Sequence, residues 1–389
     1  MLKLIRDFIF FIFIFSFFND NFMVDTLGST SLKAVFALFL FISLPEIVRS
    51  AIHSSSNAVM RSYYIFFTIL SIVSLISVAF LSKITLIDAM MVLISIHVVF
   101  TYVSHYQEFD KLLYFVWASV FTSAIISLFN DPINIDTFRT SGGTADPVEF
   151  SGHLFMGIFI SIYLFKKNSN YIFLIGSNLL FLYAMLYGGS KTAVLTVAIL
   201  LLYSLFARFG NFLRQIFSLK GFVAIVVILG VVYQANLFDK LDAVKGMQER
   251  AKTQGTADQR FISWEAGTGM IGDYFFTGVG LNEYPNYTQK YKKDYLDVAG
   301  YDPHNIFIKV FAETGVFSFL AFLTFLFFLF KTKYFELIKS DYYWITLIPL
   351  STILMGMALS TTYEKHFWLS IALLVNVILF YDKEKEHHV

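Results

Sequence analysis

The chain has 389 residues, of which 57% are hydrophobic and 15% charged, and its formal net charge is +1. This charged fraction is far below the roughly 25% of soluble domains, so the composition excludes an ordinary soluble domain and indicates a polytopic membrane protein. The small net charge gives no reason to expect a nucleic acid or acidic partner. Since there is no cysteine, disulfides, thiolate metal sites and cysteine nucleophiles are excluded.

Apolar runs near the roughly 17 to 25 residues of a bilayer helix follow one another along the chain. They lie at about 4–18, 31–44, 63–81, 84–103, 112–129, 150–165, 171–187, 192–207, 221–237, 306–330, 342–359 and 367–381. We therefore expect an all-α membrane protein with about twelve transmembrane helices. Helices 1 to 9 occupy 1–237, a large polar loop with short helices occupies 238–304, and helices 10 to 12 with a tail occupy 305–389. The first run lacks a small-x-small cleavage site, so we expect a retained span rather than a secretory signal.

The positive-inside rule, counted on short connections, predicts the orientation. With a cytoplasmic N-terminus, the inner connections carry most of the basic residues: Lys3, Arg6, Arg49, Arg61, Lys111, Lys166, Lys167, Arg208, Arg214, Lys220, Lys331, Lys333, Lys339, Lys383 and Lys385. Long loops cross largely regardless of charge, so 238–304 fits outside. We expect a multi-pass protein of the bacterial inner membrane, with both termini cytoplasmic and the loop in the periplasm.

Four basic or potentially basic residues fall on the outer side, where the rule disfavours cations. Arg139 lies in a Gly- and Pro-containing connection, Lys191 ends Gly188-Gly189-Ser190-Lys191, Arg260 lies on an expected short helix through Ile271, and His304 ends the loop. Headgroup anchoring, a solvated surface charge and helix capping are the alternatives to a functional role.

A shared chemistry explains these four positions together. Envelope polysaccharides are built on the outer side from sugars carried on a lipid diphosphate, which the reaction displaces. Arg139, Lys191 and Arg260 suit the phosphate oxygens, and stabilising a leaving group's charge is worth on the order of 10² to 10³ in rate per donor. His304 suits a general base, because the unperturbed histidine pKa of about 6.5 is near working pH.

Other polar residues are weaker candidates. Asn305, Lys309 and Glu313 are four apart on one face of the helix after His304, so Lys309 and Glu313 are expected to pair. Asp88 and His153 fall near the outer ends of their helices, and Asp146 follows Arg139 in its connection. We expect no metal and no cofactor, because the outer carboxylates are scattered, without Asp-x-Asp or His-x-x-x-His spacing.

Asp302-Pro303-His304-Asn305 is followed seven residues later by Ala312-Glu313-Thr314-Gly315 at the end of the polar loop. This pattern resembles the His-Asn…Glu-x-Gly signature of the O-antigen ligase and polymerase superfamily. Further elements with the family's order and spacing from about 138 to 330 are Arg139 with 142–147, Gly189-Ser190-Lys191-Thr192, Arg260 to Trp264, and Gly278-Val279-Gly280. Two positions depart from the family pattern: Val148, where Asn is frequent, and Lys191, where Arg is common and would add a bidentate fork.

The resemblance implies a metal-independent, inverting transfer of an undecaprenyl-diphosphate-linked oligosaccharide to an acceptor glycolipid. Asp-Pro-His-Asn and Gly-Thr-Ala-Asp-Pro look more like the polymerase versions, and a ligase acting on lipid A core is the alternative. Membrane lipids are expected partners, and a chain-length regulator is a further candidate. A glycolipid flippase or exporter is the second alternative, but transporters usually gather polar groups at the membrane midplane within repeated halves.

Overall fold

The computed structural model describes residues 2–53, 57–78, 83–129, 147–188, 190, 192–193, 195–197, 199–200, 203, 256–291, 302–357 and 364–387. Throughout these residues the secondary structure is helical, without strands, so the predicted all-α class is confirmed. The helices are α1 Leu2–Phe18, α2 Asp20–Leu27, α3 Ser29–His53, α4 Ala58–Val78, α5 Lys83–Ser104, α6 Phe109–Phe129, α7 Pro147–Lys167, α8 Tyr171–Gly188, α13 Thr256–Asp273, α14 Tyr284–Tyr291, α15 Ile306–Lys331, α16 Tyr334–Leu337, α17 Tyr343–Gly356 and α18 Lys365–His387.

The predicted apolar runs coincide with these helices wherever the chain is described. The run at 192–207 is described only at scattered residues, and 221–237 lies outside the described residues. By length and hydropathy, three described helices are able to cross a membrane, at Ala58–Ser77, Phe109–Phe129 and Ile306–Lys331. The segments Lys3–Phe18 and Asp20–Thr26 pass the same test only as a pair bent by 109°. Several apolar helices therefore support a membrane protein, and the total of about twelve spans stays a prediction.

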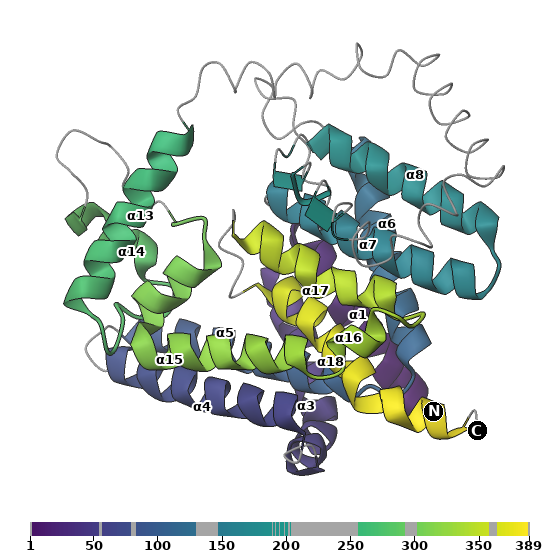
Figure 1. The fold of residues 1–389 in the computed structure, drawn as a ribbon, viewed down its shortest axis with the longest axis horizontal. Helices are drawn as coiled ribbons and strands as arrows, with labels where there is room; N and C mark the ends of the chain where they lie inside the picture. Colours follow the sequence, from purple (N-terminus) through teal and green to yellow (C-terminus); the bar gives the residue numbers. More distant parts are fainter. Residues whose placement is uncertain are drawn as a thin grey trace.

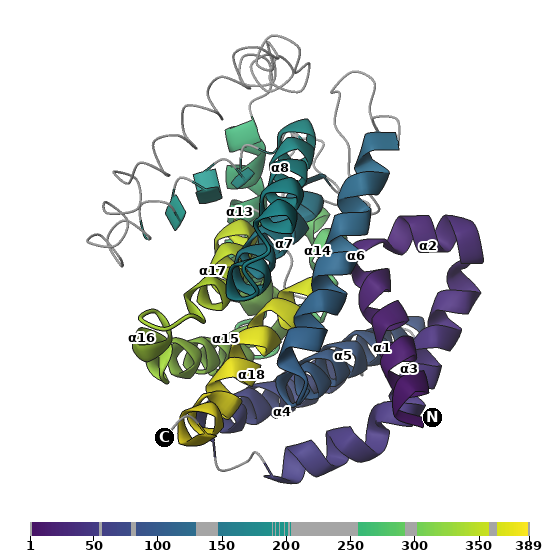
Figure 2. The same ribbon diagram turned by 90° about the vertical axis from the view of Figure 1, so that its right-hand side faces the viewer.

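The long helices pack side by side around a core rich in aromatic residues. Helix α15 runs along α4, α18 along α5, and α7 contacts α6, α8 and α17 (Figures 1 and 2). Trp368 of α18 is fully buried and stacks on Phe66 of α4 and on Phe325 of α15, with ring centroids 5.8 and 6.2 Å apart. These contacts join helices that are up to about 300 residues apart in the chain into one packed unit.

Three of the cations predicted to lie on the inner side line one pocket. Lys3, Arg6 and Arg49, from two different connections, line one pocket, and Glu108 in that pocket pairs with Lys3. The two termini lie at the lower right of Figure 1, whereas α13 and α14 lie at the left, above the opposite end of α15. The described helices of the polar loop, α13 and α14, are therefore separated from the termini by the length of α15.

The described part of the polar loop is joined to α15 through its backbone. Gly315 interrupts α15 with φ 70° and ψ 179°, which opens the helical hydrogen-bond ladder at this point. The turn after α13 occupies the opening: Val279 and Gly280 donate to the carbonyls of Ala312 and Glu313 at 2.9 and 3.0 Å, and Val316 donates to Phe275 at 2.9 Å. We call this contact between 275–280 and 312–316 the backbone interlock.

Two glycines permit the interlock. Gly278 and Gly315 both adopt positive φ, of 66° and 70°, a region that side chains disfavour. A Cβ at Gly278 would overlap the backbone of Glu313, and a Cβ at Gly315 would overlap the carbonyl of Phe276. The Gly-x-Gly and Glu-x-Gly motifs of the sequence are therefore the two halves of one contact.

The buried carboxylate of Glu313 in α15 adds a second contact with the loop, at the start of α14. It is 1% exposed, and its two oxygens accept the backbone N–H groups of Asn282 (3.1 Å) and Tyr284 (3.0 Å) at the start of α14. An acidic group at a helix N-terminus is favoured by the unpaired amides and by the helix dipole. A small separate core then joins α13, α14 and α15 through Ala266, Met270, Val279, Tyr284 and Ala312.

We expect Gly278→Ala and Gly315→Ala each to destabilise the loop relative to the helices. The positive φ alone costs about 1–3 kcal/mol per residue, and the overlap with backbone adds to this. Gly272→Ala in α13 is the matched control, because its Cβ meets nothing within 4 Å and a helical Ala gains about 0.5–1 kcal/mol over Gly. Thermal unfolding and limited proteolysis of the loop in detergent measure both effects. Wild-type protease resistance in both interlock variants would contradict the interlock.

Candidate functional site

Helix α13 holds the segment that leads into α15. Trp264 donates from Nε1 to the carbonyl oxygen of Pro303 at 2.7 Å, and Ser263 donates from Oγ to the carbonyl oxygen of Asp302 at 3.0 Å. Tyr284 of α14 supports the same turn by donating to the carbonyl oxygen of Ser263 at 2.5 Å. Burial raises the pKa of this tyrosine, so its hydroxyl stays a hydrogen-bond donor. Residues 302–303 are thereby fixed against α13.

Arg260 and His304 come from the two sides of this contact. Arg260 lies three and four residues before Ser263 and Trp264, the spacing that places side chains on one face of a helix. His304 follows Pro303 directly. Both side chains are half-buried. The structure therefore brings the two predicted catalytic residues to one region, across a contact made by their neighbours.

Asn305, and not His304, caps α15. The Asn305 side-chain oxygen accepts the N–H groups of Phe307 and Ile308 at 2.9 and 3.3 Å. His304 lies one residue earlier with a left-handed φ of 48°, which is uncommon for a residue with a side chain. Strained backbone of this kind is frequent at functional sites. Asn305, a weaker candidate for the functional site, therefore has the structural role of helix cap that the sequence left open for His304.

Lys309 lies one turn inside α15 and is 4% exposed. Its ammonium contacts both carboxylate oxygens of Asp302, at 3.0 and 3.1 Å. Glu313 attracts Lys309 as expected from their spacing, but the Glu313 oxygens also hold the amides of α14. The buried charge is therefore compensated from two sides, and Asp302, which sequence reasoning did not single out, ties the loop's exit to α15.

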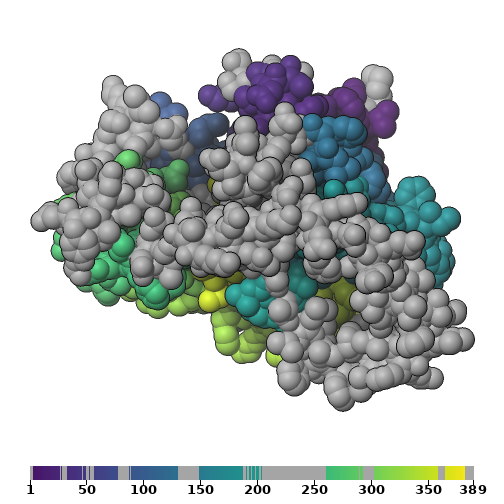
Figure 3. Space-filling model, turned by 90° about the horizontal axis from the view of Figure 1, so that it is seen from above, coloured from purple at the N-terminus to yellow at the C-terminus, as the bar shows by residue number. Residues whose placement is uncertain are grey.

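The described part of the loop carries exposed aromatic residues. Phe261, next to Arg260, is 63% exposed, and Phe276 in the interlock turn is 62% exposed. Aromatic and basic side chains together are typical of surfaces that contact the membrane interface. In the space-filling view, α13 and α14 (green) lie on the left, on the opposite side from α8 (teal) (Figure 3).

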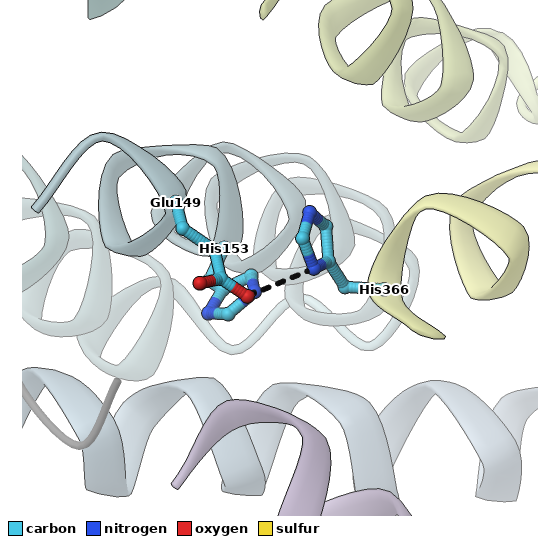
Figure 4. A group of neighbouring side chains, drawn as sticks. All are labelled: Glu149, His153 and His366. Carbon is cyan, nitrogen blue, oxygen red and sulfur yellow. Dashed lines mark ion pairs between the residues drawn. The ribbon is translucent and has the colours of Figure 1, made fainter. Parts of the chain in front are cut away.

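A second group of ionisable residues lies where α7 and α18 begin. Glu149 and His153 of α7 and His366 of α18 face one another (Figure 4). Glu149 Oε1 is 3.2 Å from His366 Nδ1 and 3.7 Å from His153 Nε2. The imidazole of His153 is fully buried, and neither of its ring nitrogens has a hydrogen-bond partner. An unsatisfied buried polar group costs about 1–3 kcal/mol.

Sequence reasoning found only His153 of this group. A useful signal was present, because Glu149 and His153 have the i, i+4 spacing that shares a helix face. The pair has the spacing Glu-x-x-x-His, which is neither Asp-x-Asp nor His-x-x-x-His. No local pattern connects either residue to His366, which lies more than two hundred positions later. Glu364, close to His366, interacts electrostatically with both Glu149 and Lys309. The group therefore neighbours the charges at the start of α15.

The remaining predicted residues are less completely placed. Arg139, Lys191 and Asp146 lie outside the described residues, and Asp88 belongs to α5 but its side chain is not among those described. Ser190, just before Lys191, is 2% exposed, and its hydroxyl accepts the N–H of Ala193 at 3.2 Å. This contact is that of a helix N-cap, as expected for a connection that ends at Lys191.

In a comparison with known protein families, one family model matches the part of the chain that contains the interlock. Residues 176–323 match the family model described as O-antigen ligase. No curated protein matches the chain significantly. The matched segment contains Lys191, Arg260, His304, Asn305 and Glu313, whereas Asp88, Arg139, Asp146 and His153 precede it. The match of residues 176–323 to the O-antigen ligase family model is thus consistent with the O-antigen ligase and polymerase superfamily that the motifs of the chain resemble.

Proposed function

We propose that this protein is a membrane glycosyltransferase that moves an undecaprenyl-diphosphate-linked oligosaccharide onto an acceptor sugar at the periplasmic face. The observation that supports this most directly is the contact of α13 with residues 302–303, which gathers Arg260 and His304 beside exposed aromatic residues. A phosphate-binding cation and a base at a membrane-facing surface are what a lipid-linked diphosphate donor requires.

The proposed reaction is a direct displacement. The acceptor hydroxyl oxygen bonds to the anomeric carbon of the donor sugar while the bond from that carbon to the diphosphate oxygen breaks. The imidazole of His304 takes the hydroxyl proton, and undecaprenyl diphosphate departs with the bonding electron pair. Attack from the face opposite the leaving group inverts the anomeric configuration.

The cations stabilise the diphosphate as it leaves. Arg260 offers its guanidinium to the phosphate oxygens, and we assign Arg139 and Lys191 to the same diphosphate. Because binding at the leaving group and proton removal need no metal here, we propose that the chemistry is metal-independent. The loop acts as a lid whose position is set by the interlock, which makes Glu313 and Asn305 positioning residues.

For the acceptor, we propose a second lipid-linked repeat, which makes the protein a polymerase of O-antigen or a related surface polysaccharide. The resemblance of Asp302-Pro303-His304-Asn305 to polymerase versions of the motif supports this choice over a ligase. We propose a bacterial inner-membrane location with cytoplasmic termini, on the excess of cations in the connections of the predicted inner side; three of these cations, Lys3, Arg6 and Arg49, line one pocket.

Arg260→Ala and His304→Ala are expected to abolish transfer while the protein still folds. Loss of a charge-stabilising donor reduces the rate by on the order of 10² to 10³, and loss of a general base by on the order of 10² to 10⁴. Arg260→Lys, which keeps the charge but not the fork, should fall between wild type and Arg260→Ala. Transfer by purified protein between lipid-linked repeats is the measurement.

Lys290→Ala is the matched control for these variants. Lys290 is an exposed cation of the same loop, on α14, and it contacts Tyr274 and Tyr291 rather than the segment before α15. Its transfer rate should equal wild type. Full activity of Arg260→Ala or of His304→Ala would remove that residue from the mechanism.

Deletion of the gene distinguishes the acceptors. A polymerase mutant should retain lipid A core that carries a single repeat, because ligation continues without chain growth. A ligase mutant should instead accumulate long chains that are not attached to core. Electrophoresis of surface polysaccharide separates these results. Retention of the lipid-linked repeat on the cytoplasmic side would contradict both transferase activities and indicate a flippase.

Chelation tests metal independence. We expect the transfer rate of purified protein to be unchanged in excess EDTA, at a temperature where the chelated protein stays folded, because no step in the proposed displacement passes through a metal. A loss of rate that Mg²⁺ or Mn²⁺ restores would show that the donor diphosphate needs a cation, and the roles assigned to Arg260 and Lys191 would then be insufficient.

A further inference from the structure

Two helices contribute three metal-ligating side chains to one buried point. Glu149 and His153 project from the same face of α7, one turn apart, and His366 is the second residue of α18. One carboxylate oxygen and two imidazole nitrogens lie within 4.8 Å of one another (Figure 4). All three residues precede or follow the segment that matches the O-antigen ligase family.

The spacing of the donor atoms suits a shared cation. Ligands about 2.0–2.1 Å from a tetrahedral zinc ion are about 3.3 Å from one another. Glu149 Oε1 lies 3.2 Å from His366 Nδ1 and 3.7 Å from His153 Nε2. All three donor atoms lie within 4.8 Å of one another, so binding an ion requires the widest separation to close toward about 3.3 Å.

His153 supplies the independent observation. Its side chain is fully buried against Phe18 (ring centroids 4.8 Å apart), yet both ring nitrogens lack a hydrogen-bond partner. An ion pair between Glu149 and His366 leaves this imidazole unsatisfied. The rings of His153 and His366 are 4.6 Å apart, so charging both histidines would bring two like charges together. A cation between the three donors would satisfy both histidines while they remain neutral.

The donor set selects the class of ion. Two imidazoles and one carboxylate are the ligands of zinc and related first-row transition metals, whereas Ca²⁺ and Mg²⁺ prefer oxygen ligands. Neighbouring charges are mixed: Glu364 and Asp20 are acidic, and Lys365 places its ammonium over the ring of Phe17 at 5.5 Å. Glu149 is the one carboxylate among the three ligands, so it supplies the negative charge that directly contacts the divalent cation.

We propose that Glu149, His153 and His366, with a water molecule as the fourth ligand, bind a divalent transition-metal ion such as Zn²⁺, which ties the start of α7 to the start of α18. Helix α18 packs on α5, and α7 on α6, α8 and α17, so the ion joins two parts of the helical core. The site is separate from glycan transfer and requires neither Arg260 nor His304.

The full-length protein in detergent, stripped by chelator, is dialysed against Zn²⁺ and analysed for bound metal and melting temperature. Every version carries His387→Ser and His388→Ser, because adjacent imidazoles at the chain end bind zinc adventitiously. The parent should bind about one Zn²⁺ per chain, with a higher Tm that chelation reverses. Glu149→Gln, His153→Gln and His366→Gln should each lose both effects.

Two controls keep the result specific. His105→Gln removes a histidine of α5 that contacts the Thr101 carbonyl instead of this group, and it should bind zinc like the parent. His304→Ala should lose transfer but keep zinc, which separates this site from the proposed function. Should a ligand variant fail to fold, Co²⁺ titration of the parent decides: saturation at about one equivalent with the visible absorption of four-coordinate cobalt supports the site. Absence of saturable binding in the parent, or unchanged zinc in all three ligand variants, overturns the proposal.

Discussion

The position of the polar loop depends on the backbone interlock between the turn after α13 and the opened turn of α15. A helix buries its own hydrogen bonds, so a second segment attaches to its backbone only where the ladder is broken. Gly315 breaks it, and Gly278 lets the other backbone approach. Glu313, between them, caps α14 with its side chain while its carbonyl accepts from Gly280. The attachment of the loop, the kink in α15 and the cap of α14 thus all depend on the same contact.

The candidate site follows from this attachment. With α13 and α14 held against α15, Ser263 and Trp264 reach the carbonyls of Asp302 and Pro303. Arg260 and His304, to which we assign the proposed chemistry, are then positioned by neighbours whose contacts are structural. Positioning by neighbouring residues suits the proposed catalysis, because a charged group stabilises a transition state best when its position is set before the substrate arrives.

Among the described residues, several buried charges lie at the starts of α7, α15 and α18. Lys309 is neutralised by Asp302 and Glu313, and Glu364 links this pair electrostatically to Glu149. An ion at Glu149, His153 and His366 would stabilise the same end of the helical core from its other side. Since charges are costly away from water, such groups persist where they are paired or where they serve a function.

The sequence by itself determined the helical class, the apolar helices, the short helix that carries Arg260 and the motifs of 278–280 and 312–315, because hydropathy, turn residues and motif order are local properties. Only the tertiary structure showed that these two motifs bind each other, that Asn305 rather than His304 caps α15, and that His366 joins Glu149 and His153. The cap is local, and only the side-chain geometry shows which of two adjacent residues makes it. The other two contacts join residues about 30 and over 200 positions apart, and a local sequence pattern does not show which distant residues meet when the helices pack.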